Sequence, residues 1–382
     1  MNYSLLDFLS LLGSLGLFLY GMKIMSEGLQ KAAGDRLRSL LSAITSNRFL
    51  GALTGLFITA MIQSSSATTV MVVSFVNAGL LNLTQAIGVI MGANIGTTAT
   101  AWIISLLGFK VEISAFTIPM MAIGIPLIFS KKSNLNAIGE FIFGFALLFL
   151  GLEFLKDSMP DLQSSPEALA FLSKYTGMGY GSILIFLLIG TVLTLIVQSS
   201  SAMVAITLVM CAQGWIPFHI GAAMILGENI GTTITANLAA LSANTTAKRA
   251  AFSHLLFNVL GVIWVLILFY PVTNLVASMV VSGGGADPRE LYDYIGSLGS
   301  RFSSDQISLM TNGETLTDPA MIAAQSQIVS YTSAVSIGLS LFHTCFNVTN
   351  MLLMIWFVPV YAKICEQVIR PAKKLKGNKE YS

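Results

Sequence analysis

Two polar blocks recur inside long apolar segments of this chain. Gln-Ser-Ser-Ser-Ala occurs at Gln63–Ala67 and again at Gln198–Ala202. A second block, Gly-x-Asn-Ile-Gly-Thr-Thr, follows each copy, at Gly92–Thr98 and at Gly227–Thr233. Both blocks recur at an offset of 135 residues, and a shared offset indicates an internal repeat. Polar interruptions at corresponding positions of two apolar halves are typical of the binding site of a secondary transporter.

The composition predicts an integral membrane protein. Hydrophobic residues make up 54% of the chain and charged residues only 10%, whereas a soluble domain has roughly 25% charged residues. Several apolar segments reach the length of about 20 residues that a membrane-spanning helix needs. This composition argues against a soluble globular protein.

The basic residues gather in four clusters, which predict the topology. By the positive-inside rule all four clusters are cytoplasmic, and the loops at 156–177 and 282–328, which are poorer in positive charge, lie outside. We therefore expect a multi-pass protein of the cell (inner or plasma) membrane with its N-terminus outside and its C-terminus in the cytoplasm. The clusters are Lys23, Lys31, Arg36, Arg38 and Arg48; Lys131 and Lys132; Lys248 and Arg249; and Arg370, Lys373, Lys374, Lys376 and Lys379.

Segment lengths then predict the fold class. Residues 49–81 begin and end on the cytoplasmic side, yet they are too short for two full spans of about 20 residues each, so a re-entrant hairpin fits. Residues 178–215 form the matching hairpin, which enters from outside. We expect an all-α integral membrane protein with two inverted-topology repeats, each containing a re-entrant helical hairpin and a broken transmembrane helix.

The same interpretation divides the chain without leaving a second domain. Repeat one covers about 49–130 and repeat two about 178–281. The extracellular loop at about 282–328 is expected to be a poorly ordered surface segment, because it is long and rich in Gly, Ser and acidic residues. A C-terminal span at 329–364 and a basic cytoplasmic tail complete a single transmembrane transporter domain over 1–382.

The chemistry of the blocks indicates a site for an anion with a co-bound cation. Hydroxyl and amide groups at helix N-termini can hold an anion, and their oxygens are hard ligands that suit Na⁺. An alternative is that the small residues only let helices pack closely or that each Asn caps a kink. The candidate anion ligands are Ser64, Ser65, Ser66, Ser199, Ser200, Ser201, Asn94 and Asn229; the candidate sodium ligands are Gln63, Gln198, Thr68, Thr97, Thr98, Thr232, Thr233 and Glu228.

Charge is sparse around these blocks. No charged residue occurs between Phe49 and Phe109, and Glu228 is the only one between Tyr175 and Ala247. We therefore expect the bound anion to meet no Arg or Lys, so a co-bound cation must offset its charge. An acid within a membrane is a candidate functional group, and Glu228 could hold a cation, take a proton or form a structural hydrogen bond.

The doubled blocks and the inverted repeats resemble the type II sodium-dependent phosphate cotransporters. The resemblance covers most of residues 49–270 and implies sodium-coupled uptake of inorganic phosphate, with Na⁺ as coupling ion and no organic cofactor. A further similarity is His-x-x-Phe-Asn, present at His254–Asn258 and His343–Asn347. These four His and Asn residues are further site candidates, with interhelical hydrogen bonding as the alternative. The element is expected after each repeat, but residues 111–130 contain neither His nor Asn.

Other functions stay open at this point. Hydroxyls and amides would equally bind sulfate or a carboxylate, and a channel or a membrane scaffold is also compatible with the pattern. No nucleophile–base pair or nucleotide loop stands out, so we expect neither an enzyme nor a nucleic-acid-binding protein. The expected partners are phosphate, sodium ions and the lipid bilayer; the oligomeric state is undetermined. Many bacterial relatives carry a C-terminal helical domain like the phosphate-signalling regulator PhoU, and we expect this chain to lack it.

Overall fold

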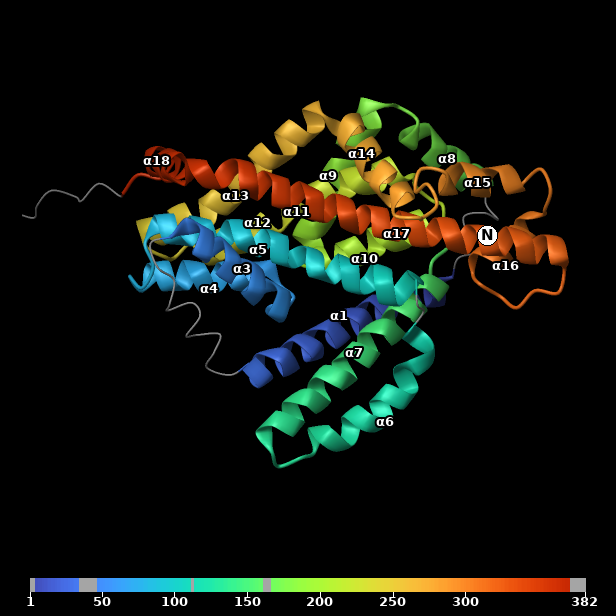
Figure 1. Cartoon of the computed structure of the whole chain (residues 1–382), viewed down its shortest axis with the longest axis horizontal. Coiled ribbons are helices and arrows are strands. Elements are labelled where there is room, and N and C mark those ends of the chain that lie inside the picture. Colours follow the sequence, from blue (N-terminus) through green and yellow to red (C-terminus); the bar gives the residue numbers. More distant parts are fainter. Residues whose placement is uncertain (1–3, 34–46, 111–112, 161–165, 372–382) are drawn as a thin grey trace, which may run out of the picture.

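A computed structural model describes residues 4–33, 47–110, 113–160 and 166–371, and every regular element in those ranges is helical. Figure 1 shows the helices running mostly along one long axis. Arg36, Arg38, Lys373, Lys374, Lys376 and Lys379 lie outside the described residues. The helices are α1 (Leu5–Ala33), α3 (Arg48–Ile62), α4 (Ser65–Asn77), α5 (Leu83–Ile103), α6 (Thr117–Ile128), α7 (Ser133–Asp157), α8 (Pro166–Thr176), α9 (Tyr180–Val197), α10 (Ser200–Ala212), α11 (Phe218–Gly231), α12 (Thr233–Ala239), α13 (Thr245–Ile267), α14 (Phe269–Ser282), α15 (Leu291–Leu298), α16 (Ser304–Thr311), α17 (Pro319–Met354) and α18 (Val358–Val368), with a π-helix, η1 (Ile104–Lys110), after α5.

Six of the described helical segments are long and apolar enough to cross a membrane, which confirms the expected multi-pass character. Large apolar side chains remain exposed on their outer faces, such as Leu6 (74%), Ile196 (72%) and Ile267 (72%). Such faces are suited to lipid, where apolar side chains need no burial in protein. The six segments are Leu5–Ala33, Leu83–Phe109, Ser133–Asp157, Tyr180–Val197, Thr245–Ile267 and Pro319–Val368.

The sequence repeat is also a repeat of helix packing. A side chain at Gly92 of α5 would meet the backbone carbonyl of Ala52 in α3, and one at Gly227 of α11 would meet that of Leu187 in α9. Both pairs are related by the offset of 135. The same holds for Gly96 against Leu56 and for Gly231 against Thr191. The glycines of the second block therefore permit close approach of two helix backbones.

A second glycine seam joins α1 to α7. Gly21 meets the backbone of Leu148, and Gly151 meets that of Phe18. Towards the other end of the seam, Gly28 meets Phe141. As residue numbers rise on one helix they fall on the other, so the two helices are antiparallel. Helix α6 packs against α7 through Gly124 and Gly139, and Figure 1 shows α1, α7 and α6 together as a panel beside the remaining helices.

Two basic residues contact the C-terminal segment at one end of the long axis. Arg48, at the start of α3, donates a hydrogen bond of 3.3 Å to the carbonyl of Trp356. Arg249, near the start of α13, donates one of 3.0 Å to the carbonyl of Ile369. Figure 1 shows α18 at this end and α15, α16 and α8 towards the other. One residue from each of two basic clusters therefore lies at the same end as the C-terminal helix.

The structure differs from the sequence predictions at three places. Helix α5 passes through Gly92–Thr98 without interruption, so the transmembrane helix expected to break there in repeat one is continuous. Residues 250–281, expected as one span, divide at Leu268 into α13 and α14.

The third difference concerns the loop at 282–328, which is not poorly ordered. It contains α15 and α16, and it also holds the first residues of α17. Apolar residues such as Leu291 and Ile295, each 1% exposed, fix α15 to the rest of the protein. Hydrogen bonds from Arg289 hold the pKa of Asp287 below its usual value at the start of this segment. The high Gly and Ser content concealed these apolar anchors.

Candidate functional site

Each Gln-Ser-Ser-Ser block forms the tip of a helical hairpin with the same backbone geometry. Gln63 ends α3 in the left-handed region (φ 57°, ψ 26°), and Gln198 ends α9 there too (φ 55°, ψ 25°). Ser64 then caps α4 by accepting a hydrogen bond from the amide of Ala67, and Ser199 caps α10 in the same way from Ala202. Each tip therefore points the start of a helix, whose first N–H groups have no partner within the helix, at the space beside it.

The two glutamines are conformationally unusual. Among the described residues they are the only ones other than glycine with a positive φ. This conformation costs roughly 1–2 kcal/mol for a residue with a Cβ atom. The same unfavourable conformation therefore recurs at two equivalent tips, and strain of this kind is concentrated at functional sites in proteins.

Both tips line one cavity of about 340 Å³. Repeat one contributes Gln63, Ser64 and Ser66, and repeat two contributes Gln198 and all three of its serines. Two helix N-termini and a set of hydroxyl and amide groups therefore converge from opposite halves of the chain on one space. The lining residues are Leu19, Met22, Lys23, Ser26, Glu27, Gln30, Ile62, Gln63, Ser64, Ser66, Ala67, Gln198, Ser199, Ser200 and Ser201.

Helix α1 supplies the remaining wall of this cavity and corrects one prediction. Ser26 donates a hydrogen bond of 2.5 Å to the carbonyl of Ile62, directly before the first tip, and Gln30 donates one of 2.9 Å to Ser26. Lys23 and Glu27 lie on the same wall, with 3.9 Å between Nζ and Oε1. The expectation that a bound anion would meet no basic side chain is therefore wrong, because α1 brings a lysine from outside the repeats.

A hydrogen-bonded chain connects the two tips. Thr100 of α5 donates a hydrogen bond of 2.9 Å to Oε1 of Gln63. The hydroxyl of Thr100 also lies 3.4 Å from that of Ser201 on the second tip. Gln63 itself donates to the carbonyl of Ala60. The side chain of Gln63 is thus held in place, with 5% of the residue exposed.

The second polar block lies beside the cavity and not on its wall. Asn94 and Asn229 sit within helices, where each donates its amide to the carbonyl four residues earlier, at Ile90 and Ile225. They therefore do not cap a half-helix, as one interpretation had it. The threonines of both blocks donate to backbone carbonyls three or four residues earlier, through Thr97, Thr98, Thr232 and Thr233. Ser65 and Thr68 are likewise buried behind the first tip.

Each of the two His-x-x-Phe-Asn elements contacts a different repeat. Nε2 of His254, on α13, lies 3.4 Å from Oδ1 of Asn94 in repeat one. Nε2 of His343, on α17, lies at the same distance from Oδ1 of Asn229 in repeat two. All four residues are buried. Each element therefore contacts one Asn of the second block, although both elements follow the repeats in the sequence.

The other polar atoms of these elements show a matched pattern. Asn258 and Asn347 donate their amides to the carbonyls of His254 and His343. Nδ1 of each histidine and Oδ1 of each asparagine are buried without a hydrogen-bond partner in the described part of the chain. Because neither set lines the cavity, the arrangement favours a positioning role for these residues.

Comparison with known proteins identifies the family. A model of the Na⁺/Pi-cotransporter family matches residues 17–157 and 168–282. The chain belongs to the Na⁺/Pi-cotransporter family. The match covers both hairpins and α1 from residue 17 onward, so the part of the helix that supplies Lys23 belongs to the family's domain.

Individual relatives agree with this assignment. YjbB of Salmonella typhimurium and of Escherichia coli, whose name proposes inorganic phosphate export, are each 27% identical over 97% of this chain and 57% of their own length. YqeW of Bacillus subtilis, an uncharacterized protein, is 32% identical over 69% of this chain and 82% of its own. The sodium-dependent phosphate transport protein 2A of Rattus norvegicus is 41% identical over 25% of this chain and 16% of its own.

The chain spans a little more than half the length of the YjbB proteins that it matches. No solved structure matches it. The assignment to the family therefore rests on the family model, which covers both repeats.

Glu228 distinguishes repeat two from repeat one. The residue at the equivalent position of repeat one is Ala93. Glu228 is 1% exposed, and Oε1 accepts a hydrogen bond of 2.6 Å from Thr207 of α10, while Oε2 has no partner within the described residues. Because Glu228 does not line the cavity, any cation that it holds would lie behind the second tip.

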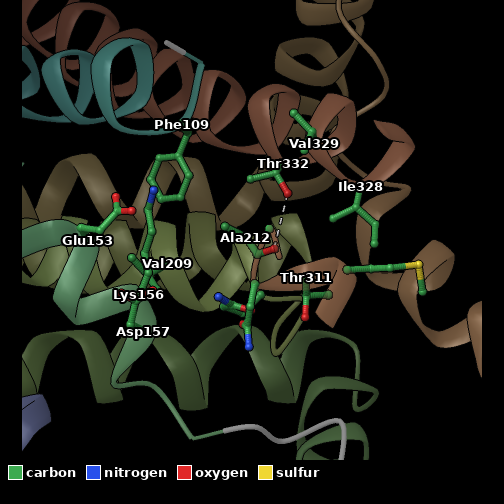
Figure 2. Close-up of a pocket in the computed structure, with 14 residues that line it drawn as sticks. Phe109, Glu153, Lys156, Asp157, Val209, Ala212, Thr311, Ile328, Val329 and Thr332 are labelled. Atoms are coloured by element: carbon green, nitrogen blue, oxygen red, sulfur yellow. Dashed lines mark hydrogen bonds between the residues drawn. The ribbon is translucent and has the colours of Figure 1, made fainter. Parts of the chain in front are cut away.

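A second cavity, of about 180 Å³, lies towards the end of the molecule that carries α16. Figure 2 shows Glu153, Lys156 and Asp157 of α7 on one side and Thr311 and Thr332 on the other. Lys156 donates a hydrogen bond of 2.6 Å to the carbonyl of Gly108 and covers the ring of Phe109. Neither Gln-Ser-Ser-Ser tip reaches this cavity, so it is not the paired site.

The cavity wall on α1 was missed by the sequence analysis, although a signal was present. Lys23, Ser26, Glu27 and Gln30 are spaced by three or four residues, which puts them on one face of a helix. The sequence indicates for Lys23 only a place in a cytoplasmic basic cluster. Thr100, two residues after the second block, was missed because nothing in the sequence predicts that its hydroxyl faces the tips.

Proposed function

We propose that this protein is a secondary active transporter that couples uptake of inorganic phosphate to sodium, by alternating access at a site between its two Gln-Ser-Ser-Ser tips. The observation that carries the proposal is that both tips line one cavity. A tetrahedral oxyanion requires several donors around it, and the convergence of two helix N-termini with serine hydroxyls supplies them.

The phosphate ligands in this proposal are the tip serines and, less directly, the two asparagines. Ser64, Ser66, Ser199, Ser200 and Ser201 would donate hydroxyl or backbone N–H groups to the phosphate oxygens. Ser65 would contribute through the backbone, because it is buried and does not line the cavity. Asn94 and Asn229 would act by holding the helices behind the tips, through the contacts with His254 and His343.

Sodium would supply the missing positive charge. Lys23 and Glu27 lie on the same wall with opposite charges, so the side chains that line the cavity carry no net positive charge. Each helix N-terminus supplies about half a unit of charge, which leaves a divalent phosphate under-compensated. Oxygen atoms of Gln63, Gln198, Thr68, Glu228 and the four threonines of the second block are the proposed ligands, and binding of either ion would favour the other.

The proposal includes inverted repeats with re-entrant hairpins. Support comes from the equivalent glycine contacts of α3–α5 and α9–α11. The antiparallel packing of α1 against α7, the helices that precede the two hairpins, also supports opposite orientation of the repeats. With the end that carries Arg48, Arg249 and α18 in the cytoplasm, α3 enters from the cytoplasm and α9 from outside. The N-terminus would then lie outside, in the inner or plasma membrane.

Transport by reconstituted protein tests the proposal and its direction. Labelled phosphate is supplied to proteoliposomes that carry a sodium gradient, a potassium gradient or neither. We expect accumulation that requires the sodium gradient and follows its direction. Equal uptake in sodium and potassium would refute the coupling. Preference for sulfate or a carboxylate over phosphate would reassign the substrate, and flux that does not saturate would favour an anion channel.

A further inference from the structure

Among the described residues, Lys23 is the one basic side chain on the wall of the cavity that both tips share. It projects from the α1 face that also carries Ser26, Glu27 and Gln30. Because Ser26 bonds to the carbonyl of Ile62 and Gln30 bonds to Ser26, this face of α1 is fixed to the base of the first tip. The position of Lys23 relative to the serines is therefore set by the fold.

The contacts of Lys23 leave it available to an anion. The Nζ–Oε1 distance to Glu27 is 3.9 Å, at the limit of an ion pair, and the two side chains are 65% and 48% exposed. A pair as exposed as this one contributes little to stability. A phosphate in the cavity would offer Lys23 a charge-assisted hydrogen bond, which is stronger than this loose pairing.

We propose that Lys23 is a substrate-binding residue that draws phosphate into the cavity from the side on which the cavity opens, and that Glu27 competes with phosphate for it. The inference rests on the proposed phosphate transport and adds a specificity-determining charge to it. Lysine suits this role because its ammonium is a mobile point charge on a flexible stem. It can meet the anion at the mouth and release it, whereas a rigid bidentate contact would hold it.

The packing of α1 against α7 limits this role to one side of the membrane. The glycine seam relates α1 to α7 by an offset of 130 residues, because Gly21 corresponds to Gly151. At this offset Lys23 corresponds to Glu153 and Glu27 to Asp157. Those two acids line the other cavity, towards the opposite end of the molecule (Figure 2). The two cavities therefore differ in charge, and the effect of Lys23 should be felt from one face only.

The test compares K23Q, K23R and E27Q with K132Q, a control at an exposed lysine of the α6–α7 turn that lines neither cavity. Phosphate half-saturation is measured from each face of orientation-sorted proteoliposomes, at low and high ionic strength. For K23Q we expect a rise of roughly three- to tenfold from one face, smaller at high salt because screening weakens exposed charges. K23R should keep half-saturation within about twofold of wild type but lower the maximal rate, because a bidentate contact releases phosphate more slowly, and E27Q should lower half-saturation about twofold.

The outcomes separate this inference from the function on which it rests. Wild-type protein that shows no saturable phosphate binding would refute both. If wild-type transport is saturable but K23Q and K132Q behave alike, only the proposed role of Lys23 is overturned. Lys23 would then be a lysine at the membrane surface with no part in binding phosphate. An effect of K23Q that appears only in vesicles with anionic lipid would assign the lysine to lipid headgroups and equally overturn it.

Discussion

The two hairpin tips share a backbone and differ in how firmly they are held. At the first tip, Gln63 is buried and bonded to Thr100, Thr59 bonds to Thr68 at 3.0 Å, and Ser26 bonds to the carbonyl of Ile62. At the second tip, Gln198 is exposed and makes no side-chain hydrogen bond within the described residues. Equivalent sequence blocks therefore form one braced tip and one open tip.

The residues at equivalent positions explain this difference. Met203 stands where repeat one has Thr68, so the hydroxyl of Thr194, the counterpart of Thr59, is buried without a partner in the part of the chain described. No helix comparable to α1 bonds to the carbonyl before Gln198 among the described contacts. We infer that repeat one provides a fixed half of the site and that the second tip is the half free to move.

Glycine substitutions should have the largest effect and test the equivalence of the two repeats. Gly92→Ala and Gly227→Ala each place a methyl group against a backbone carbonyl, of Ala52 and Leu187. Overpacking of this kind costs about 1–3 kcal/mol or more. We expect both variants to lower the thermal unfolding temperature in detergent by similar amounts, with Gly13→Ala, which has open space, as the control. A large effect in one repeat alone would contradict equivalent packing.

Glu228→Gln sharpens the difference between the repeats, because repeat one has Ala93 at this position. Gln keeps the shape and the hydrogen bond from Thr207 but removes the charge. If Glu228 holds a sodium ion, the loss of this charged ligand should weaken sodium binding by about 1.5–3 kcal/mol, the range for a bond to a charged group. We expect the sodium or pH dependence of phosphate transport to change by roughly tenfold in half-saturation, with a smaller change in maximal rate. If the sodium dependence and the pH dependence of phosphate transport both stay unchanged, Glu228 has only a structural role.

The outline of this fold could be predicted because its determinants are local and repeated. The offset of 135 located both tips, and the polar breaks predicted a helix N-terminus after each of them. Contacts between distant segments could not be predicted. Nothing in the sequence near His254 indicates that this histidine contacts Asn94. Likewise, nothing in the sequence near Ser26 indicates that α1 contacts the first tip through this serine. Helices α15 and α16 were missed because a few apolar anchors outweigh a composition that is typical of loops.

Thr100→Val should have a smaller effect, confined to the tips. Valine keeps the volume and removes the hydrogen bond to Gln63 and the contact with Ser201. A single hydrogen bond contributes about 0.5–1.5 kcal/mol. We expect faster hydrogen exchange around residues 60–66, approaching the rate around residues 195–201, while exchange in α7 stays the same. If the two tips already exchange at equal rates in the wild-type protein, the contrast between a braced and an open tip is wrong.

The central claim, that the two tips form one phosphate site, is tested most directly by a double-mutant cycle. Phosphate binding is measured by titration calorimetry in sodium for the wild-type protein, Ser66→Ala, Ser200→Ala and the double variant, with Ser173→Ala on α8 as a control. Each single variant should lose about 1.5–3 kcal/mol of binding, and the losses should be non-additive because both serines contact one ligand. Wild-type affinity in either single variant, or strictly additive losses, would contradict a shared site.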